Sequence, residues 1–199
     1  MAKQPVPCVF IEGGPDNGNC NRIQIDNEQG AYEATRYLIA QGRKNIIHVT
    51  GDMNYTASLE RLNGFVHAMR DSHIPITADS ILYADFFEES AYRQITELLE
   101  RDIHPDAVFA GADKTAYGVL RALMNAGISI PGETAVIGFD DDTPDSRDII
   151  FPGLSTMRQP MYEMGCAAVE LLLAAIRDPA HQPETRCFQP HLILRETCK

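Results

Sequence analysis

Carboxylates, one arginine and one phenylalanine are the residues of this chain whose types and positions could bind a small polar molecule. Four apolar runs each end on an aspartate, and these are Asp52, Asp85, Asp113 and Asp140. Phe86 directly follows Asp85. Arg61 lies in the helix-length stretch after the first run. Carboxylates accept hydrogen bonds from paired hydroxyls, a guanidinium donates two parallel bonds, and a ring stacks on the apolar face of a sugar. This set of groups therefore suits a neutral polyol.

The apolar runs predict the elements that position these groups. Short segments rich in Val, Ile and Phe, at 46–50, 80–84, 107–111 and 134–139, alternate with helix-length stretches. This alternation is typical of buried parallel strands joined by helices, with right-handed crossovers. The polar last residues of the strands would then gather at one edge of the sheet, which is where open α/β sheets bind ligands. Further strands are predicted at 8–11, 23–25, 154–159 and 192–195, and further helices at 28–41 and 161–176.

Several of these residues also allow a purely structural interpretation. Asp113 stands directly before a helix and could simply cap it, whereas Asp140 and Arg61 are not needed as caps at their positions. The triplet Asp140 to Asp142 could bind Mg²⁺ or Ca²⁺, but it lacks the spacing of an EF-hand loop, so we expect a solvated acidic loop. His48 lies inside an apolar run and is expected to be a core residue rather than a base.

Composition excludes several classes of function. The chain has 17 Lys plus Arg against 28 Asp plus Glu, a formal net charge of −11, so this segment alone should not hold DNA. Its five cysteines form no metal-binding spacing and are expected to be free thiols in a reducing compartment. The first residues form no apolar leader and no run approaches the length of a membrane span, so we expect a cytoplasmic location. Nucleotide, nucleophile and zinc motifs are absent from the sequence, so we expect neither cofactor nor enzymatic activity.

Eight motifs occur in order across nearly the whole chain. They lie at residues 26–39, 58–65, 105–110, 113–118, 127–131, 136–141, 154–160 and 192–196. Together they resemble the LacI/GalR family of bacterial transcription regulators. The resemblance implies a type I periplasmic-binding-protein-like core of two lobes, which binds a small effector and dimerises.

The resemblance also suggests a role for individual residues. Arg61 matches the family's effector-contacting arginine, Phe86 its stacking aromatic residue and Asp140 its hydroxyl-binding aspartate, while Asp113 keeps the acidic half of an Asn-Asp pair. Gln159 matches a contact at the crossover between lobes, and Glu12 falls near an acidic contact of the other lobe. Ala112 replaces the family's effector-binding amide, which leaves the effector's identity open among sugars, polyols and nucleoside-like molecules.

The resemblance divides the chain into two parts. Residues 27–158 and 189–199 would form a nearly complete C-terminal lobe, and residues 1–26 and 159–188 a remnant of the N-terminal lobe. Such a remnant should leave a sheet edge and an apolar helix face uncovered. The expected function is the effector-binding and dimerisation region of a repressor that reaches operator DNA through a headpiece outside this chain. The alternatives are a soluble periplasmic-type sugar receptor and an enzyme that uses Asp140 and Asp85 as acid and base.

Overall fold

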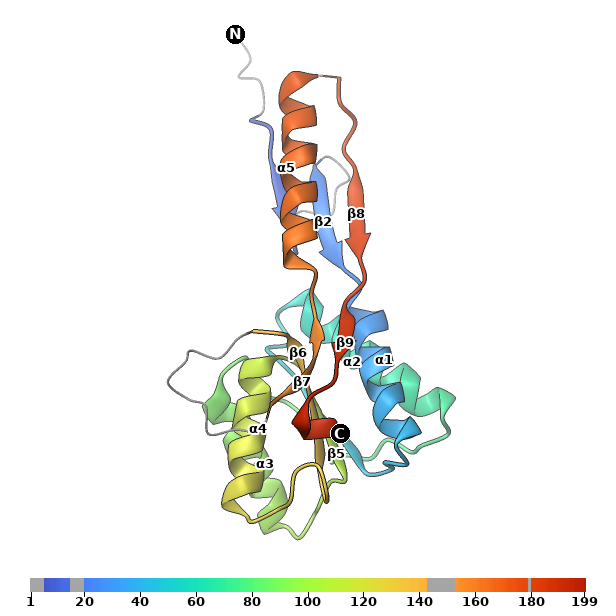
Figure 1. Cartoon of the computed structure of the whole chain (residues 1–199), viewed down its shortest axis with the longest axis vertical. Coiled ribbons are helices and arrows are strands. Elements are labelled where there is room, and N and C mark those ends of the chain that lie inside the picture. The colour runs from blue at the N-terminus through green and yellow to red at the C-terminus, as the bar shows by residue number, and fades with distance from the viewer. Residues whose placement is uncertain (1–5, 15–19, 143–152, 179) are drawn as a thin grey trace. The chain divides into compact units, whose positions relative to one another are not determined.

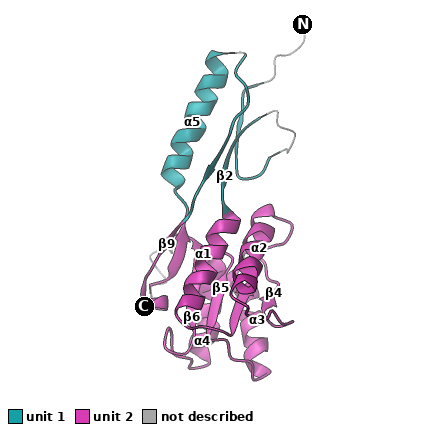
Figure 2. Ribbon diagram, turned by 90° about the vertical axis from the view of Figure 1, so that its right-hand side faces the viewer, with its two compact units in different colours: residues 1–26, 159–190 teal, residues 27–158, 191–199 magenta. Residues whose placement is uncertain are grey.

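The computed structural model describes residues 6–14, 20–142, 153–178 and 180–199. The chain forms two compact units, each built from segments that are distant in the sequence (Figure 2). Unit 1 comprises residues 1–26 and 159–190, and unit 2 comprises residues 27–158 and 191–199.

Unit 2 contains a six-stranded sheet with the strand order β4-β3-β5-β6-β7-β9. Its strands are β3 (Ile46–Val49), β4 (Ile81–Leu82), β5 (Ala107–Ala110), β6 (Ala135–Asp140), β7 (Ser155–Arg158) and β9 (His191–Ile193). All neighbouring pairs are parallel except β7 and β9, which run antiparallel. The predicted α/β fold with a parallel sheet is therefore confirmed, with one antiparallel strand, β9, at the edge.

Two pairs of helices enclose this sheet. Helices α1 (Asn27–Ala40) and α2 (Thr56–Asp71) pack together on one face, and α3 (Glu88–Glu100) and α4 (Asp113–Asn125) pack together on the other (Figure 1). The strands β3 and β5 are buried at every position, because both faces of the sheet are covered. Fully buried apolar side chains from the strands and from the inner faces of α3 and α4 form the core on that side, among them Ile95, Val108, Leu120, Leu123 and Val136.

His48 in β3 lies in this core. Its ring is fully buried and stacks between Phe65 and Phe109, with ring centroids 5.4 and 4.8 Å away. Its Nδ1 lies 2.9 Å from the carbonyl oxygen of Phe109, while Nε2 has no hydrogen-bond partner in the described part of the chain. Burial lowers the pKa of His48 to about 4, so the ring is neutral at pH 7. The prediction of a core residue is confirmed, although only one of the two ring nitrogens is hydrogen-bonded.

Unit 1 contains a smaller parallel sheet with the strand order β1-β2-β8. Its strands are β1 (Val9–Ile11), β2 (Asn21–Ile25) and β8 (Thr185–Phe188), and its helix is α5 (Met161–Arg177). The sequence did not predict β8, because TRCF lacks a buried apolar pattern and alternates between exposed and half-buried positions. Helix α5 packs on β1 and β2 and buries Met164, Ala167, Ala168 and Leu171.

The outer side of α5 is apolar and exposed. Val169 is 56% exposed, Leu173 41% and Ile176 57%, and Tyr162 near the helix start is 81% exposed. This agrees with the expectation of an uncovered apolar helix face. Within the described ranges, no helix combines the length and the apolar character needed to cross a bilayer.

Candidate binding site

Arg61 joins three elements at the carboxyl edge of the large sheet. It is 5% exposed, and its Nε donates to the Asn27 side chain at 2.9 Å. Its Nη1 donates to the carbonyl oxygen of Gly111, after β5, at 2.6 Å, and its Nη2 lies 3.4 Å from Oδ1 of Asp140, at the end of β6. The guanidinium also lies over the Phe139 ring, 3.7 Å from its centroid. The structure thus brings together Arg61 and Asp140, which are distant in the sequence.

Phe86 lies at the same edge, in the loop that leads from β4 to α3. It packs so closely on Gly51, after β3, that a Cβ atom at that position would lie 2.1 Å from the ring. Gly51 in turn adjoins Gly111, whose carbonyl oxygen accepts the bond from Arg61. Phe86 and Arg61 are thus linked through two adjoining glycines at the ends of β3 and β5, and a shared effector contact stays a prediction.

Tyr55 is a candidate that the sequence did not indicate. Its ring stands edge-on to Phe86, with centroids 5.5 Å apart and an interplanar angle of 74°, and the residue is 58% exposed. The two rings form an aromatic pair that packs, through Phe86, on Gly51 at the carboxyl edge of the sheet. Only the loop geometry brings them together, because Tyr55 lies 31 residues before Phe86 and in no shared motif.

Asp113 is buried and fully engaged by neighbouring groups. Its Oδ1 accepts from the Thr156 hydroxyl at 2.6 Å and its Oδ2 from the Asp142 backbone N–H at 2.8 Å. Burial raises its pKa to about 7, and the nearby charge of Asp140 adds to this rise. The helix-cap interpretation of Asp113 is wrong, since both oxygens bond to groups outside α4. A direct contact with an effector stays a prediction.

The acidic triplet that begins with the last residue of β6 differs from the expected solvated loop. The Asp141 side chain is 14% exposed and forms ion pairs with Arg158 at 2.5 Å and with Arg195 at 2.6 Å. The expectation of solvation is therefore wrong for Asp141, because two arginines that are distant in the sequence converge on it. The rest of the expected loop, from residue 143 to 148, lies outside the described residues. Among those that are described, no group of three or more His, Cys, Asp or Glu could hold a metal ion.

Asp85, the second acidic group predicted for this edge, has a local structural role. Its Oδ1 accepts from the backbone N–H of Phe87 at 2.9 Å, which shapes the turn before α3. The residue is half-buried, and none of its described contacts favours a role as an acid or a base.

Glu12 and Gln159 belong to unit 1 and are described within it. Glu12 has a positive φ of 51°, and its Oε1 accepts from the Ile25 backbone N–H at 2.7 Å. Gln159 lies two residues before the start of α5, and its carbonyl oxygen accepts from the N–H of Met161 at 2.9 Å. Their participation in effector binding stays a prediction.

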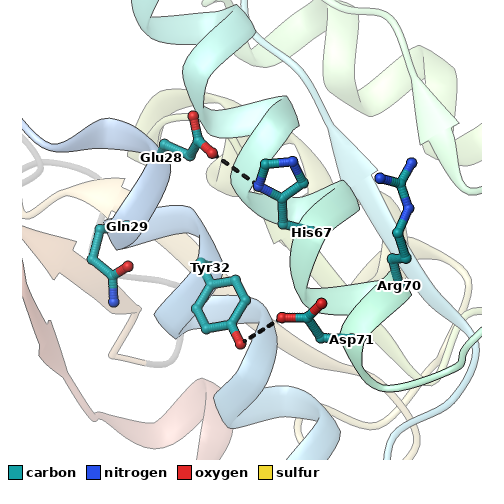
Figure 3. Close-up of a pocket in the computed structure, with 6 residues that line it drawn as sticks. All are labelled: Glu28, Gln29, Tyr32, His67, Arg70 and Asp71. Carbon is teal, nitrogen blue, oxygen red and sulfur yellow. Dashed lines mark hydrogen bonds and ion pairs between the residues drawn. The ribbon is translucent and has the colours of Figure 1, made fainter.

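A separate groove lies between α1 and α2 (Figure 3). Its volume is about 410 Å³, and two cross-helix contacts bridge it, from His67 to Glu28 at 2.9 Å and from Tyr32 to Asp71 at 3.0 Å. Its carboxylates are thus already engaged, and none of the predicted site residues lines it. The carboxyl edge of the sheet remains the better candidate for the binding site.

A mostly parallel sheet has helices on both faces, and at its carboxyl edge a buried arginine lies over an aromatic ring and pairs with an aspartate. These features define an α/β domain of the small-molecule-binding type. Comparison with known families identifies it further. The chain belongs to the family of periplasmic binding protein-like domains, whose profile matches residues 35–198.

Individual relatives are LacI-type transcription regulators, which confirms the resemblance noted in the sequence. The HTH-type transcriptional repressor PurR of Actinobacillus pleuropneumoniae serotype 3 is 33% identical over 196 residues, which cover 98% of this chain and 58% of the repressor. The structure of the transcriptional regulator CelR in complex with cellobiose is 30% identical, with a TM-score of 0.85, over 95% of this chain and 58% of that chain. A LacI family regulator from Enterococcus faecium with bound ribose is 28% identical, with a TM-score of 0.83, over 96% and 70%. The chain thus spans less than two thirds of the PurR repressor it matches.

Proposed function

We propose that this chain is the effector-binding and dimerisation region of a LacI-type repressor that senses a sugar or sugar-like molecule. The observation that carries the proposal is the contact of the buried Arg61 with the partly exposed Asp140 at the carboxyl edge of the sheet. The regulators of known structure support it, since one is described with cellobiose and another with ribose. That the relatives are regulators favours this reading over a transport receptor or an enzyme.

The chemistry of the edge agrees with a neutral, hydroxyl-rich effector. Asp140 would accept hydrogen bonds from adjacent hydroxyls, and Arg61 would hold Asp140 and donate to a ring or hydroxyl oxygen. Phe86 and Tyr55 would contact the apolar face of a sugar ring. Asp113 would complete this set, whereas Gln159 and Glu12 of unit 1 stay candidates by the family resemblance alone.

Operator binding would belong to the regulator as a whole. The net charge of −11 gives this segment no general attraction for phosphate, so we place DNA recognition in a helix-turn-helix headpiece outside it. The repressor would act in the cytoplasm as a homodimer. Effector binding would shift the equilibrium between two arrangements of the lobes and so change operator affinity.

A ligand screen with two variants tests the proposal. Thermal-shift measurements and calorimetry with pentoses, hexoses, disaccharides, polyols and nucleosides should identify at least one stabilising compound. Asp140→Ala and Arg61→Ala should each weaken its binding by about 2 to 5 kcal/mol, because each removes one member of a charge pair that would bind the effector. This loss is roughly 30-fold or more in Kd.

Arg70→Ala is the matched control, since Arg70 lies on the same helix as Arg61 but is exposed. It should bind the ligand as the unchanged protein does. Unaltered binding in both Asp140→Ala and Arg61→Ala would remove these residues from the site. A screen in which every compound leaves the thermal transition unchanged would contradict the proposed function itself.

A further inference from the structure

Two consecutive residues at the end of β6 have backbone conformations that L-amino acids rarely adopt. The φ angle of Asp140 is 118° and that of Asp141 is 62°. Neither residue is glycine, so each conformation costs on the order of 1 to 3 kcal/mol and persists only where the surroundings impose it. One of the two residues, Asp140, is the proposed effector-binding aspartate. What imposes this turn therefore determines where that carboxylate points.

Two arginines hold the Asp141 side chain from different strands. Nε of Arg158, at the end of β7, donates to Oδ2 at 2.5 Å, and Nη2 of Arg195, just after β9, donates to Oδ1 at 2.6 Å. Arg195 is itself fixed, because its Nη1 donates to the Leu154 carbonyl oxygen at 2.7 Å and its backbone N–H to the Ser155 hydroxyl at 2.8 Å. Although burial acts to raise the pKa of Asp141, the bonds from both arginines outweigh it and lower that pKa, so the side chain is ionised at pH 7.

The backbone that follows is pinned as well. The N–H of Asp142 donates to Asp113, and the Thr156 hydroxyl, which bonds to Asp113 at 2.6 Å, also accepts from the N–H of Asp141 at 3.4 Å. The side chain of Asp142, by contrast, is exposed. The strained turn is thus fixed through the carboxylate of Asp141 and through main-chain groups, while the Asp142 carboxylate contributes no described contact.

We propose that Asp141 is a positioning residue for the effector site: its contacts with Arg158 and Arg195 impose the turn that presents Asp140 to Arg61. The inference rests on the proposed function and extends it. Arg158 is the last residue of unit 2 before the chain enters unit 1, and Arg195 follows shortly after the chain returns at His191. The same carboxylate therefore ties the site to both segments that connect the units, along which effector binding would be transmitted.

The decisive experiment needs no effector. Nitrogen-15 NMR of the arginine side chains in the full chain would compare Asp141→Asn with Asp140→Asn. We expect Asp141→Asn to change the Arg61 Nη2 signals by at least half as much as Asp140→Asn does. The Arg61 Nε signal should stay in place in Asp141→Asn, because Asn27 holds this group independently. A purely stabilising ion pair would lower the thermal transition and leave the Arg61 signals unchanged.

Asp142→Asn is the matched control. It removes the same charge one residue further along, and we expect no change at Arg61. Should Asp141→Asn fail to fold, Arg158→Gln removes one of the two contacts at a half-exposed residue and should produce a smaller change of the same kind. The proposal is overturned if the Arg61 Nη2 signals stay unchanged in Asp141→Asn. If only Arg158→Gln folds, unchanged signals in that variant overturn it instead. Either result is independent of whether any sugar binds.

Discussion

Both units pack helices on a sheet, but the helices cover the sheet more completely in unit 2 than in unit 1. In unit 2, helices cover both faces of the sheet, and the inward residues of α4 such as Leu120 and Leu123 are fully buried. In unit 1, a single described helix, α5, packs on β1 and β2 of the three-stranded sheet, and it exposes Val169 and Ile176 by more than half. Buried apolar area is the main source of folding stability. The difference teaches that most of the stability should reside in unit 2.

Charged side chains are also more buried in unit 2 than in unit 1. Unit 2 buries Arg61 and Asp113 and nearly buries Asp141. In unit 1, Arg186 pairs with Glu170 and Glu184, and these side chains are 36%, 68% and 48% exposed. Exposed pairs contribute little, whereas buried charges are costly and are retained where they serve a function. The chemistry of the described chain is therefore concentrated in unit 2.

The largest expected difference between the units is in hydrogen exchange. Because α5 has few buried contacts, its amides should exchange through local opening, whereas those of α4 should require unfolding of the unit 2 core. We expect amides of Met161–Arg177 to exchange roughly 10³-fold faster than those of Asp113–Asn125 in dilute protein, a difference of about 4 kcal/mol in opening free energy. Equal protection of both helices would break the comparison. Protection of α5 that rises with protein concentration would indicate that a second copy covers its apolar side.

Truncation of one leucine in each unit gives the next largest effect. Leu120→Ala in α4 should lower the free energy of unfolding by about 2 to 5 kcal/mol, because it leaves a cavity in a fully buried site. Leu173→Ala in α5, whose side chain is 41% exposed, should change it by no more than about 0.5 kcal/mol. Urea denaturation of the two variants checks this. A similar loss in both would mean that the exposed side of α5 is covered in solution.

The strand ends and helix faces of unit 2 could be predicted from sequence, because they depend on local periodicity. Runs such as 46–50 and 107–111 contain the residues of β3 and β5, and Arg61 and Asp140 meet because parallel strands share one carboxyl edge. The features that the sequence did not predict all depend on contacts between segments that are distant in the sequence. Strand β8 has no apolar pattern and forms by pairing with β2, and Asp141 is desolvated only because Arg158 and Arg195 converge on it. Tyr55 meets Phe86 through loop geometry, which carries no periodic signal.

Two buried groups of unit 2 should give it opposing responses to pH. Asp113 has a raised pKa of about 7, so its contribution to stability is fully present below pH 3.8 and is lost as the pH rises toward 7. His48 has a lowered pKa of about 4, so its contribution is present above pH 6.5 and is lost as the pH falls toward 4. Between pH 4 and 6.5 the two slopes should largely cancel.

Single variants should reveal each slope. In Asp113→Asn, the free energy of unfolding should fall by about 3 kcal/mol when the pH is lowered from 6.5 to 4, since the response of His48 is then no longer offset. In His48→Asn, it should fall by a similar amount when the pH is raised over the same range. Urea titrations at several pH values check both. Parallel profiles in the two variants would show that neither group controls the pH response of unit 2.

The smallest expected effect concerns two glycines with the same backbone conformation. Gly127 lies two residues after the end of α4 and has a φ of 74°, and Gly13 lies two residues after the end of β1 and has a φ of 80°. A Cβ atom at either position would meet no atom within 4 Å. Alanine at either site therefore adds only backbone strain, about 1 kcal/mol. If unit 2 gives the main unfolding transition, Gly127→Ala should lower its free energy of unfolding by this amount. Gly13→Ala should leave that free energy unchanged, because strain in a unit that opens separately does not contribute to the transition. Urea denaturation followed by circular dichroism measures both, and an equal loss would show that the two units unfold as one.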